Sequence, residues 1–216
     1  MPEFIPSTED GIRYAAEALI RGFVVAFPTE TVYGLGGNAY DDGAVSRLFF
    51  CKGRPKAKPL SVCYPSFDKV TGDAEVDDRA RIFAEKFMPG PVTLVLRKKN
   101  GTRLSCLGLA GQETVGIRVP ADSTAQKLLS MLPFPLAVPS ANMSGGASPS
   151  RAQQVFENFK QNRELIILDG GTCKIGIPST VIDLVEGKIL RHGAVAAPAI
   201  EELLRKLAYR LLTNSP

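Results

Sequence analysis

Helix-like and strand-like patterns alternate along most of this chain of 216 residues. From Thr8 to Arg21 the apolar residues recur at helical spacing, and the short apolar run Phe23–Phe27 that follows has the length of a strand. Near the other end of the chain, two apolar runs separated by Glu186-Gly187 are typical of a β-hairpin. Alternation of this kind predicts an α/β (α+β) fold in which helices pack against one twisted sheet. The hairpin makes that sheet mixed rather than purely parallel.

The whole chain, 1–216, is predicted to form a single domain, because it shows no internal repeat and no linker long enough to separate two units. The expected helices share an apolar stripe, and five of them are Thr8–Arg21, Asp77–Phe87, Ser123–Leu132, Arg151–Phe159 and Ala199–Leu211. A further helix is expected to start near Asp41 or Asp42 and to run into the cations that begin at Lys52. The expected strands are short apolar runs: Phe23–Phe27, Leu60–Tyr64, Val92–Leu96, Thr114–Val119, Leu136–Val138, Leu165–Leu168, Thr180–Val185 and Lys188–Arg191.

Composition and charge narrow the kinds of ligand. The formal net charge of +4 suits an anionic ligand but falls short of the strongly basic signature of most nucleic-acid-binding proteins. His192 is the only histidine and the four cysteines lie far apart, which excludes a multi-histidine metal site and a closely spaced zinc site. No apolar run approaches the roughly 20 residues that span a bilayer. Since the N-terminus also lacks a signal-peptide pattern, we expect a soluble cytoplasmic protein without a membrane partner.

Five segments combine glycine, proline, hydroxyl or cationic residues with an adjacent apolar run. They are Pro28–Gly36, Lys52–Val62, Val115–Pro120, Pro139–Asn142 and Pro178–Asp183. At strand ends, such residues place polar groups around the crevice in which open α/β sheets bind ligands. In the first segment the glycines predict a turn whose backbone N–H groups are free to hold an anion, although glycine and proline also form plain turns. Together the segments predict a site for a small charged ligand.

The second segment carries cations at every second position: Lys52, Arg54, Lys56 and Lys58. The two prolines in this run favour extended backbone in the residues that precede them. Extended chain sends alternate side chains to the same side. Several cations would then face one way and bind a polyphosphate, whereas the alternative is a solvated charged run.

Arg118 lies inside an otherwise apolar strand, where a cation must be paired or face a cavity. It is therefore either half of a structural ion pair or a clamp for a substrate carboxylate. Ser140, Asn142 and Ser179 supply short donors and acceptors at strand ends, and their alternative role is to cap turns or helices. The small polar segment Ser144–Ser150 is either a loop that closes over a ligand or a plain surface loop.

Motifs of the common nucleotide-binding and hydrolytic folds are missing from the sequence. There is no G-x-x-x-x-G-K-[ST] run, no G-x-G-x-x-G fingerprint and no G-x-S-x-G elbow. A Cys–His nucleophilic pair is disfavoured because no third orienting group is apparent. Nucleotide binding would therefore rest on a less common scaffold.

In their order along roughly Ala16–Gly193, the motifs resemble those of the YrdC-type threonylcarbamoyl-AMP synthase family. The motifs that carry the resemblance are PTETVYGLG, KGR with KPL, PGPVT, VGIRVP, SAN, DGG, PSTVID and LR. The resemblance implies a YrdC-like domain whose twisted mixed sheet and flanking helices surround a basic cavity. It also implies an adenylate-forming nucleotidyltransferase that makes threonylcarbamoyl-AMP and pyrophosphate from L-threonine, bicarbonate or CO2, and ATP.

The resemblance further implies roles for individual residues. Catalysis and phosphate binding would fall to Lys52 and Arg54. The implied ATP contacts are these two residues with Lys58, Thr114, Ser140, Asn142, Ser148 and Arg191. The implied threonine contacts are Thr29, Cys63, Arg118 and Ser179. Some members carry histidine at the place of Cys63, so a contact there is replaced or missing. Mg2+ would accompany ATP, and no protein ligand is assigned to it.

The implied partners are a separate transferase complex, which passes the threonylcarbamoyl group to an adenosine of tRNA, and tRNA as a further contact. Longer members add a second domain, so this chain resembles the short form, in which a loop or a partner must cover the site. Two other interpretations stay open. One is a paralogue of the same fold that acts on another carbamoyl-type substrate, which Cys63 allows. The other is an RNA-binding module that uses the basic cavity without chemistry.

Overall fold

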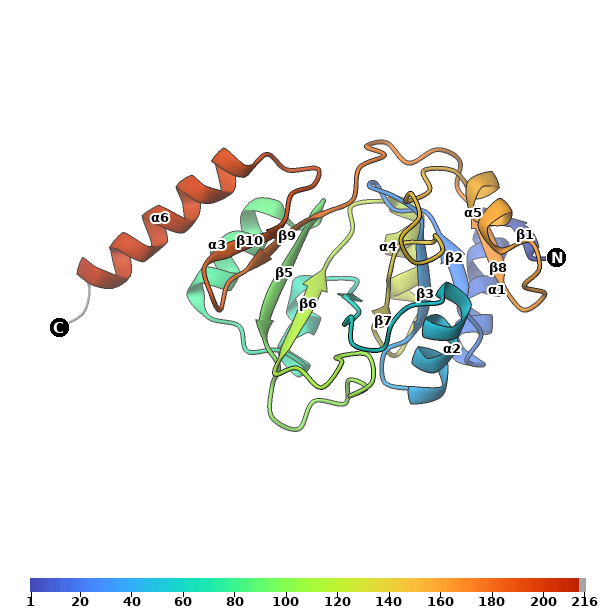
Figure 1. The fold of residues 1–216 in the computed structure, drawn as a ribbon, viewed down its shortest axis with the longest axis horizontal. Coiled ribbons are helices and arrows are strands. Elements are labelled where there is room, and N and C mark those ends of the chain that lie inside the picture. Colours follow the sequence, from blue (N-terminus) through green and yellow to red (C-terminus); the bar gives the residue numbers. More distant parts are fainter. Residues whose placement is uncertain (214–216) are drawn as a thin grey trace.

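The computed structural model describes residues 1–213, with side chains through Leu207. Within these residues one ten-stranded sheet contains β1 (Glu3–Pro6), β2 (Val25–Phe27), β3 (Gly34–Asn38), β4 (Val62–Cys63), β5 (Val92–Arg97), β6 (Thr114–Arg118), β7 (Leu136–Ala137), β8 (Ile166–Asp169), β9 (Thr180–Asp183) and β10 (Lys188–Arg191). The helices are α1 (Glu9–Ile20), α2 (Asp42–Lys52), the 3-10 helix η1 (Phe67–Gly72), α3 (Asp78–Phe87), α4 (Ser123–Ser130), α5 (Ala152–Phe159) and α6 (Ala197–Thr213). In Figure 1, α1, β1 and β8 lie at one end of the molecule and α6, β9 and β10 at the other.

The strands follow one another across the sheet in the order β1-β8-β2-β3-β7-β4-β6-β5-β9-β10. The pairs β1–β8, β8–β2, β4–β6 and β5–β9 are parallel. The other neighbours are antiparallel, including the closing hairpin of β9 and β10. The predicted mixed sheet and its hairpin are therefore confirmed.

Side-chain caps explain where the first helices begin. Thr8, Asp41, Asp77 and Asp122 each accept a hydrogen bond from a backbone N–H in the first turn of α1, α2, α3 and α4. The predicted helices are confirmed to within a few residues at their ends. α2 ends at Gly53, whose φ of +58° lies in the left-handed region that favours glycine. Along the described part of the chain, no helix combines the length and the apolar character that a membrane span requires.

Alternate residues of the strands enter two cores on opposite faces of the sheet. On β2, Val25 and Phe27 join a smaller core with α1 and α4, whereas Ala26 joins a larger core on the other face. The larger core continues behind β7, β4, β6, β5 and β9, where it includes side chains of α2, α3 and α6. The smaller core reaches only as far as Leu136 on β7 and Cys63 on β4. Beyond these strands the smaller core no longer covers its face of the sheet, which leaves room there for a crevice.

The segment Gly34–Asn38 is a strand, β3, and the open turn that its glycines predicted is wrong. β3 pairs with both β2 and β7, so this backbone forms sheet hydrogen bonds instead of offering its N–H groups to an anion. Glycine is required because the neighbours are close: a Cβ at Gly36 would lie 2.8 Å from the ring of Phe27. The turn occurs just before the strand, at Thr29–Val32.

Candidate active site

The candidate site lies beside the smaller core, on the same face of the sheet. Residues two apart along the chain point to it, as Ser61 and Cys63 do at β4. Ser140 reaches it from the segment after β7, and Arg118 from the end of β6. Val62, between the two β4 residues, belongs to the larger core behind the sheet. The floor of the site is therefore a single sheet layer.

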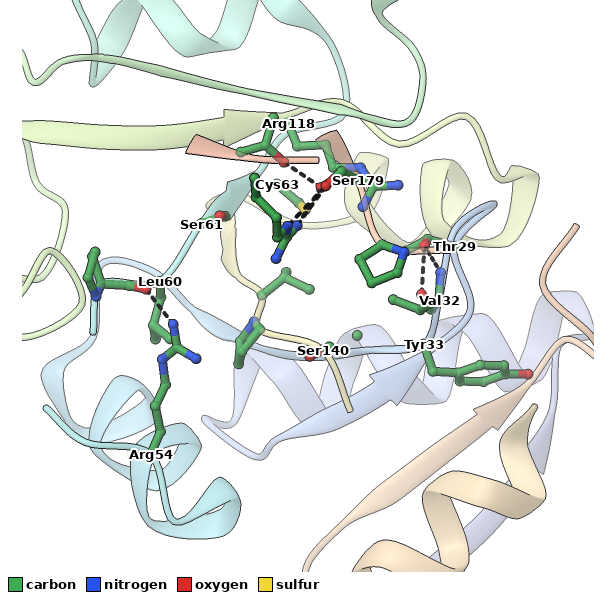
Figure 2. Close-up of a pocket in the computed structure, with 17 residues that line it drawn as sticks. Thr29, Val32, Tyr33, Arg54, Leu60, Ser61, Cys63, Arg118, Ser140 and Ser179 are labelled. Atoms are coloured by element: carbon green, nitrogen blue, oxygen red, sulfur yellow. Dashed lines mark hydrogen bonds between the residues drawn. The ribbon is translucent and has the colours of Figure 1, made fainter. Parts of the chain in front are cut away.

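These residues line a cavity of about 120 Å³. The predicted site residues that line it are Thr29, Arg54, Cys63, Arg118, Ser140, Ser179 and Arg191. Figure 2 shows Arg54 on one side of the cavity and Thr29 on the other, with Arg118 and Ser179 above Ser140. Three guanidinium groups border the cavity, whereas none of its described lining residues is Asp or Glu. This charge favours an anionic ligand.

The cations from Lys52 to Lys58 do not face one way, so the extended run that their alternation predicted is wrong. Lys52 is the last residue of α2, Gly53 reverses the chain in the left-handed conformation, and the N–H of Lys58 closes a tight turn. The backbone is therefore helical and then turned, which sends the side chains in different directions. Arg54 lines the cavity, while Lys56 and Lys58 are exposed.

Backbone carbonyls hold the guanidinium of Arg54. Its Nε donates to the carbonyl of Lys58 at 3.0 Å, and its Nη2 donates to that of Pro59 at 2.8 Å. Burial lowers the pKa of Arg54 from its ordinary value. Because the groups that hold this partly desolvated cation are neutral, they do not cancel its positive charge. Arg54 can therefore bind an anion.

Lys52 lies behind the wall of the cavity and is 2% exposed. Its Nζ donates to the backbone carbonyls of Ser140 and Asn142, each at 2.6 Å, and to Oδ1 of Asn142 at 3.2 Å. Burial lowers the pKa of Lys52 to about 8, and the nearby charge of Arg54 adds to this effect. The ammonium group therefore fixes the Ser140–Asn142 segment instead of pointing freely at a ligand.

The turn before β3 is built on the hydroxyl of Thr29. Its Oγ1 accepts hydrogen bonds from the N–H groups of Thr31 and Val32, each at 3.2 Å, and donates to the carbonyl of Val32 at 2.6 Å. The same oxygen lies 2.9 Å from Oγ1 of Thr31. This local network fixes the position of Thr29 at the corner of the cavity.

Arg118 is ion-paired and also faces the cavity, so both of its predicted environments are present. Its Nη2 donates to Oε1 of Glu30 at 2.7 Å and to Oγ1 of Thr31 at 2.8 Å. Its Nε lies 3.4 Å from the carbonyl of Gly90. Among the residues described, none accepts a hydrogen bond from Nη1. One nitrogen of the guanidinium therefore remains for a ligand.

Arg191 and Ser179 also line the cavity, and Ser179 lies on the same side as Arg118 (Figure 2). Nη2 and Nε of Arg191 donate to the carbonyl of Ser179 at 2.9 and 3.1 Å, and Nη2 also donates to its Oγ at 3.1 Å. Ser179 Oγ lies 2.9 Å from Oγ1 of Thr93. Burial lowers the pKa of Arg191, and the charges of Arg118 and Arg54 lower it further. The three guanidinium groups repel one another across the cavity, and a bound anion would relieve that repulsion.

Cys63 forms part of the floor. Burial raises the pKa of its thiol to about 12, so the group is protonated at neutral pH. A protonated thiol is a poor nucleophile. The structure therefore offers no support for covalent chemistry at Cys63.

Four other predicted residues do not line the cavity. Lys58 is exposed, Asn142 lies buried and donates to the carbonyls of the following loop, and Ser148 is half-buried in that loop. Thr114 begins β6, at the end of the strand opposite to Arg118. Their nucleotide contacts stay predictions. Within the described residues, no group of three or more His, Cys, Asp or Glu side chains is arranged to hold a metal ion.

The sequence interpretation missed several residues of the site. Ser61 and Thr93 also line the cavity, and Glu30 supports Arg118 from behind. Period-two spacing from Cys63 would have found Ser61, since both side chains leave the same face of an extended chain. The partner of Arg118 could not be found in this way, because 88 residues separate it from Glu30.

The fold and the cavity define an α/β protein with a cation-lined crevice whose charge favours an anionic ligand. The chain belongs to the Sua5/YciO/YrdC family: residues 17–193 match the family Sua5_yciO_yrdC, whose description reads "Telomere recombination". The family resemblance of the sequence motifs is thereby confirmed.

Among similar curated proteins, the threonylcarbamoyl-AMP synthase of Pyrococcus abyssi is 45% identical over 91% of this chain and 58% of its own length. The threonylcarbamoyl-AMP synthase of Bacillus subtilis is 40% identical over 92% of this chain and 58% of its own length. The chain thus spans 58% of the length of these two relatives.

Solved structures share the same fold. Sua5 of Pyrococcus abyssi complexed with L-threonine is 43% identical and superposes with a TM-score of 0.87, covering 94% of this chain and 60% of that one. Escherichia coli YciO is 25% identical with a TM-score of 0.78, covering 89% of this chain and 96% of that one. The predicted fold class is confirmed.

Proposed function

We propose that this protein is an L-threonylcarbamoyladenylate synthase. It would be an adenylate-forming nucleotidyltransferase that converts L-threonine, bicarbonate or CO2, and ATP into threonylcarbamoyl-AMP and pyrophosphate. The observation that carries the proposal is the cavity in which Arg54, Arg118 and Arg191 converge, with no Asp or Glu among its described lining residues. The names of the two relatives support it, as does the similarity to a Sua5 structure that holds L-threonine.

The charge of the cavity suits the first step of this reaction. The amine of threonine attacks CO2, a C–N bond forms, and the amine proton passes to solvent. Nearby cations disfavour an ammonium group, and they favour both the free amine and the anionic carbamate that it becomes. In the second step a carbamate oxygen attacks the α-phosphorus of ATP and the bond to pyrophosphate breaks. This chemistry needs positioning and charge neutralisation rather than a protein nucleophile.

On the threonine side, the free Nη1 of Arg118 would bind the carboxylate of the amino acid. Thr29 and Ser179 would border the rest of the substrate. Cys63 would contribute a weakly polar thiol at the floor, where some family members carry histidine.

On the nucleotide side, Arg54 and Arg191 would bind phosphate oxygens directly. Lys52 would add positive charge from behind Ser140. Mg2+ would be held mainly by the oxygens of the ATP phosphates. The remaining proposed nucleotide contacts are Lys58, Thr114, Ser140, Asn142 and Ser148.

The product is a mixed anhydride, whose carbonyl group must reach an acceptor before water hydrolyses it. We infer that a separate transferase complex takes the product in the cytoplasm and passes the threonylcarbamoyl group to an adenosine of tRNA. A paralogue with another carbamoyl-type substrate is the second candidate, and the observation that favours it is Cys63 at the floor.

The test is pyrophosphate release by the purified protein with ATP and Mg2+, omitting threonine and bicarbonate in turn. Release that requires both supports the proposal, and release without threonine supports the paralogue. Folded protein that releases no pyrophosphate but binds RNA in a salt-sensitive manner would instead be an RNA-binding module.

A further inference from the structure

Glu30 is a buried carboxylate directly behind Arg118. It is 6% exposed and is not among the residues that line the cavity. Its Oε1 accepts the hydrogen bond from Arg118 Nη2 at 2.7 Å, and its Oε2 accepts one from the backbone N–H of Ala121 at 3.1 Å. The reaction proposed above gives Glu30 no part, yet both of its oxygens are occupied.

The fold fixes Glu30 independently of Arg118. The bond from Ala121 ties the carboxylate to the segment between β6 and α4. The backbone carbonyl of Glu30 accepts a hydrogen bond from the N–H of Ile175 at 2.8 Å, in the connection between β8 and β9. Two separate segments therefore hold Glu30 in place independently of the guanidinium.

Glu30 determines which nitrogen of Arg118 is free. Nη2 is shared between Glu30 and Thr31, and Nε faces the carbonyl of Gly90. Because a guanidinium group is planar and rigid, fixing these two nitrogens also fixes the direction of Nη1. Without the carboxylate, the end of the side chain could rotate and present another nitrogen to the cavity.

We propose that Glu30 is a positioning residue, which orients Arg118 so that Nη1 meets the carboxylate of the amino-acid substrate. This inference rests on the proposed function. The competing role is that Glu30 only dampens the charge of Arg118, and the two roles predict effects of opposite sign. Removal of a damping charge strengthens the attraction for a carboxylate, whereas removal of an orienting group weakens binding.

The substitution Glu30→Gln separates the two roles. The Gln side chain has one acceptor oxygen where Glu30 uses two, so its NH2 group must face a donor, either Arg118 or the N–H of Ala121. We expect the dissociation constant for L-threonine, measured by calorimetry, to rise at least about tenfold. The dissociation constant for ATP should stay within about twofold, since the proposed nucleotide contacts are other residues.

The matched control is Glu202→Gln, which removes an exposed carboxylate paired with Lys206 on α6. It makes the same chemical change far from the cavity and should alter neither affinity. Glu30→Asp keeps the charge and both acceptor oxygens but withdraws them by one methylene group. We expect it to bind threonine more weakly than the wild type and more tightly than Glu30→Gln.

A double-mutant cycle completes the test. If Glu30 acts through Arg118, Glu30→Gln should cause no further loss of threonine affinity in an Arg118→Ala background. Unchanged or tighter threonine binding by Glu30→Gln would overturn the inference, and Glu30→Asp carries the same test if the Gln variant does not fold. Wild-type protein that binds no threonine would refute the proposed function instead, so the two failures are distinguishable.

Discussion

Lys52 and Arg54 are two residues apart, yet they meet different surroundings. The ammonium of Lys52 is buried against backbone carbonyls, whereas the guanidinium of Arg54 borders the cavity. The residue between them, Gly53, reverses the chain and so separates the two directions. One cation therefore supports the wall of the site, and the other is available to a ligand.

Arg54→Ala should lower the rate of pyrophosphate release about a hundredfold or more, because a fixed cation beside the reacting phosphates is lost. The fold should remain intact, since within the described residues the guanidinium of Arg54 donates hydrogen bonds to two backbone carbonyls of a turn. Lys56→Ala is the matched control, because Lys56 is exposed in the same turn. A rate for Arg54→Ala equal to that of the wild type would remove Arg54 from the mechanism.

The pH dependence of activity should report Lys52. Its lowered pKa of about 8 means that the folded protein loses this proton as the pH rises through that value. A neutral amine donates more weakly to the carbonyls of Ser140 and Asn142, so pyrophosphate release should decline above about pH 8. Deprotonation of threonine would change the rate in the opposite direction. A pH–rate profile that keeps rising to about pH 9.5 would contradict the supporting role of Lys52.

The free energy of unfolding should also depend on the protonation of Lys52, but it should rise with pH where activity falls. The unfolded chain keeps the Lys52 proton up to a pKa of about 10.4. Between the two pKa values the unfolded state binds more protons, so the contribution of Lys52 to the free energy of unfolding increases with pH. Urea unfolding of the wild type and of Lys52→Met at about pH 7 and pH 9 checks this difference.

At the scale of elements, the sequence predicted the helices well because their caps and apolar stripes are local signals. Thr8 and Asp77, for example, cap α1 and α3 at the positions where the predicted helices begin. β3 was missed because glycine is a poor strand former. The reason for a glycine at position 36 is the close approach of Phe27 and Leu136, which only the folded structure shows. β1 was missed because it is a mostly exposed strand whose partner, β8, lies far away in the sequence.

The end of α2 gives a test at this scale. Gly53→Ala should reduce the free energy of unfolding by about 1–2 kcal/mol, because a Cβ is unfavourable in the left-handed conformation. It should also reduce activity by displacing Arg54, and urea unfolding with a pyrophosphate assay measures both. Gly72→Ala is a suitable control, since a Cβ there meets no atom within 4 Å. Equal losses of stability in both variants would show that backbone conformation is not the cause.

For the whole molecule, the sequence was sufficient to predict a mixed sheet with helices, and its ordered motifs identified the family. It was not sufficient to predict which face carries the site. That depends on where α1 and α4 stop covering the sheet, which is a property of packing between distant segments. The ion pair of Arg118 with Glu30 was likewise beyond reach, because both partners needed the completed sheet.

Repulsion among the three arginines predicts that anions stabilise the whole protein. A ligand present at about 100 times its dissociation constant should add about 2.7 kcal/mol to the free energy of unfolding. For a chain of this length the corresponding rise in Tm is about 5–10 °C. ATP and inorganic pyrophosphate should produce it in a thermal-shift measurement, and uncharged adenosine should not. Arg54→Ala should weaken the effect, and equal stabilisation by adenosine would contradict a charge-based site.

The single-layer floor also limits how such genes can change in length. Along β6, Ile117 belongs to the core behind the sheet while Arg118, the next residue, faces the cavity. An insertion or deletion of one residue within this strand would exchange the two faces, placing an apolar side chain in the crevice and a cation in the core. Changes of codon number should therefore be tolerated in exposed turns such as the one at Glu186 and Gly187, whereas within the floor strands only paired changes preserve the pattern.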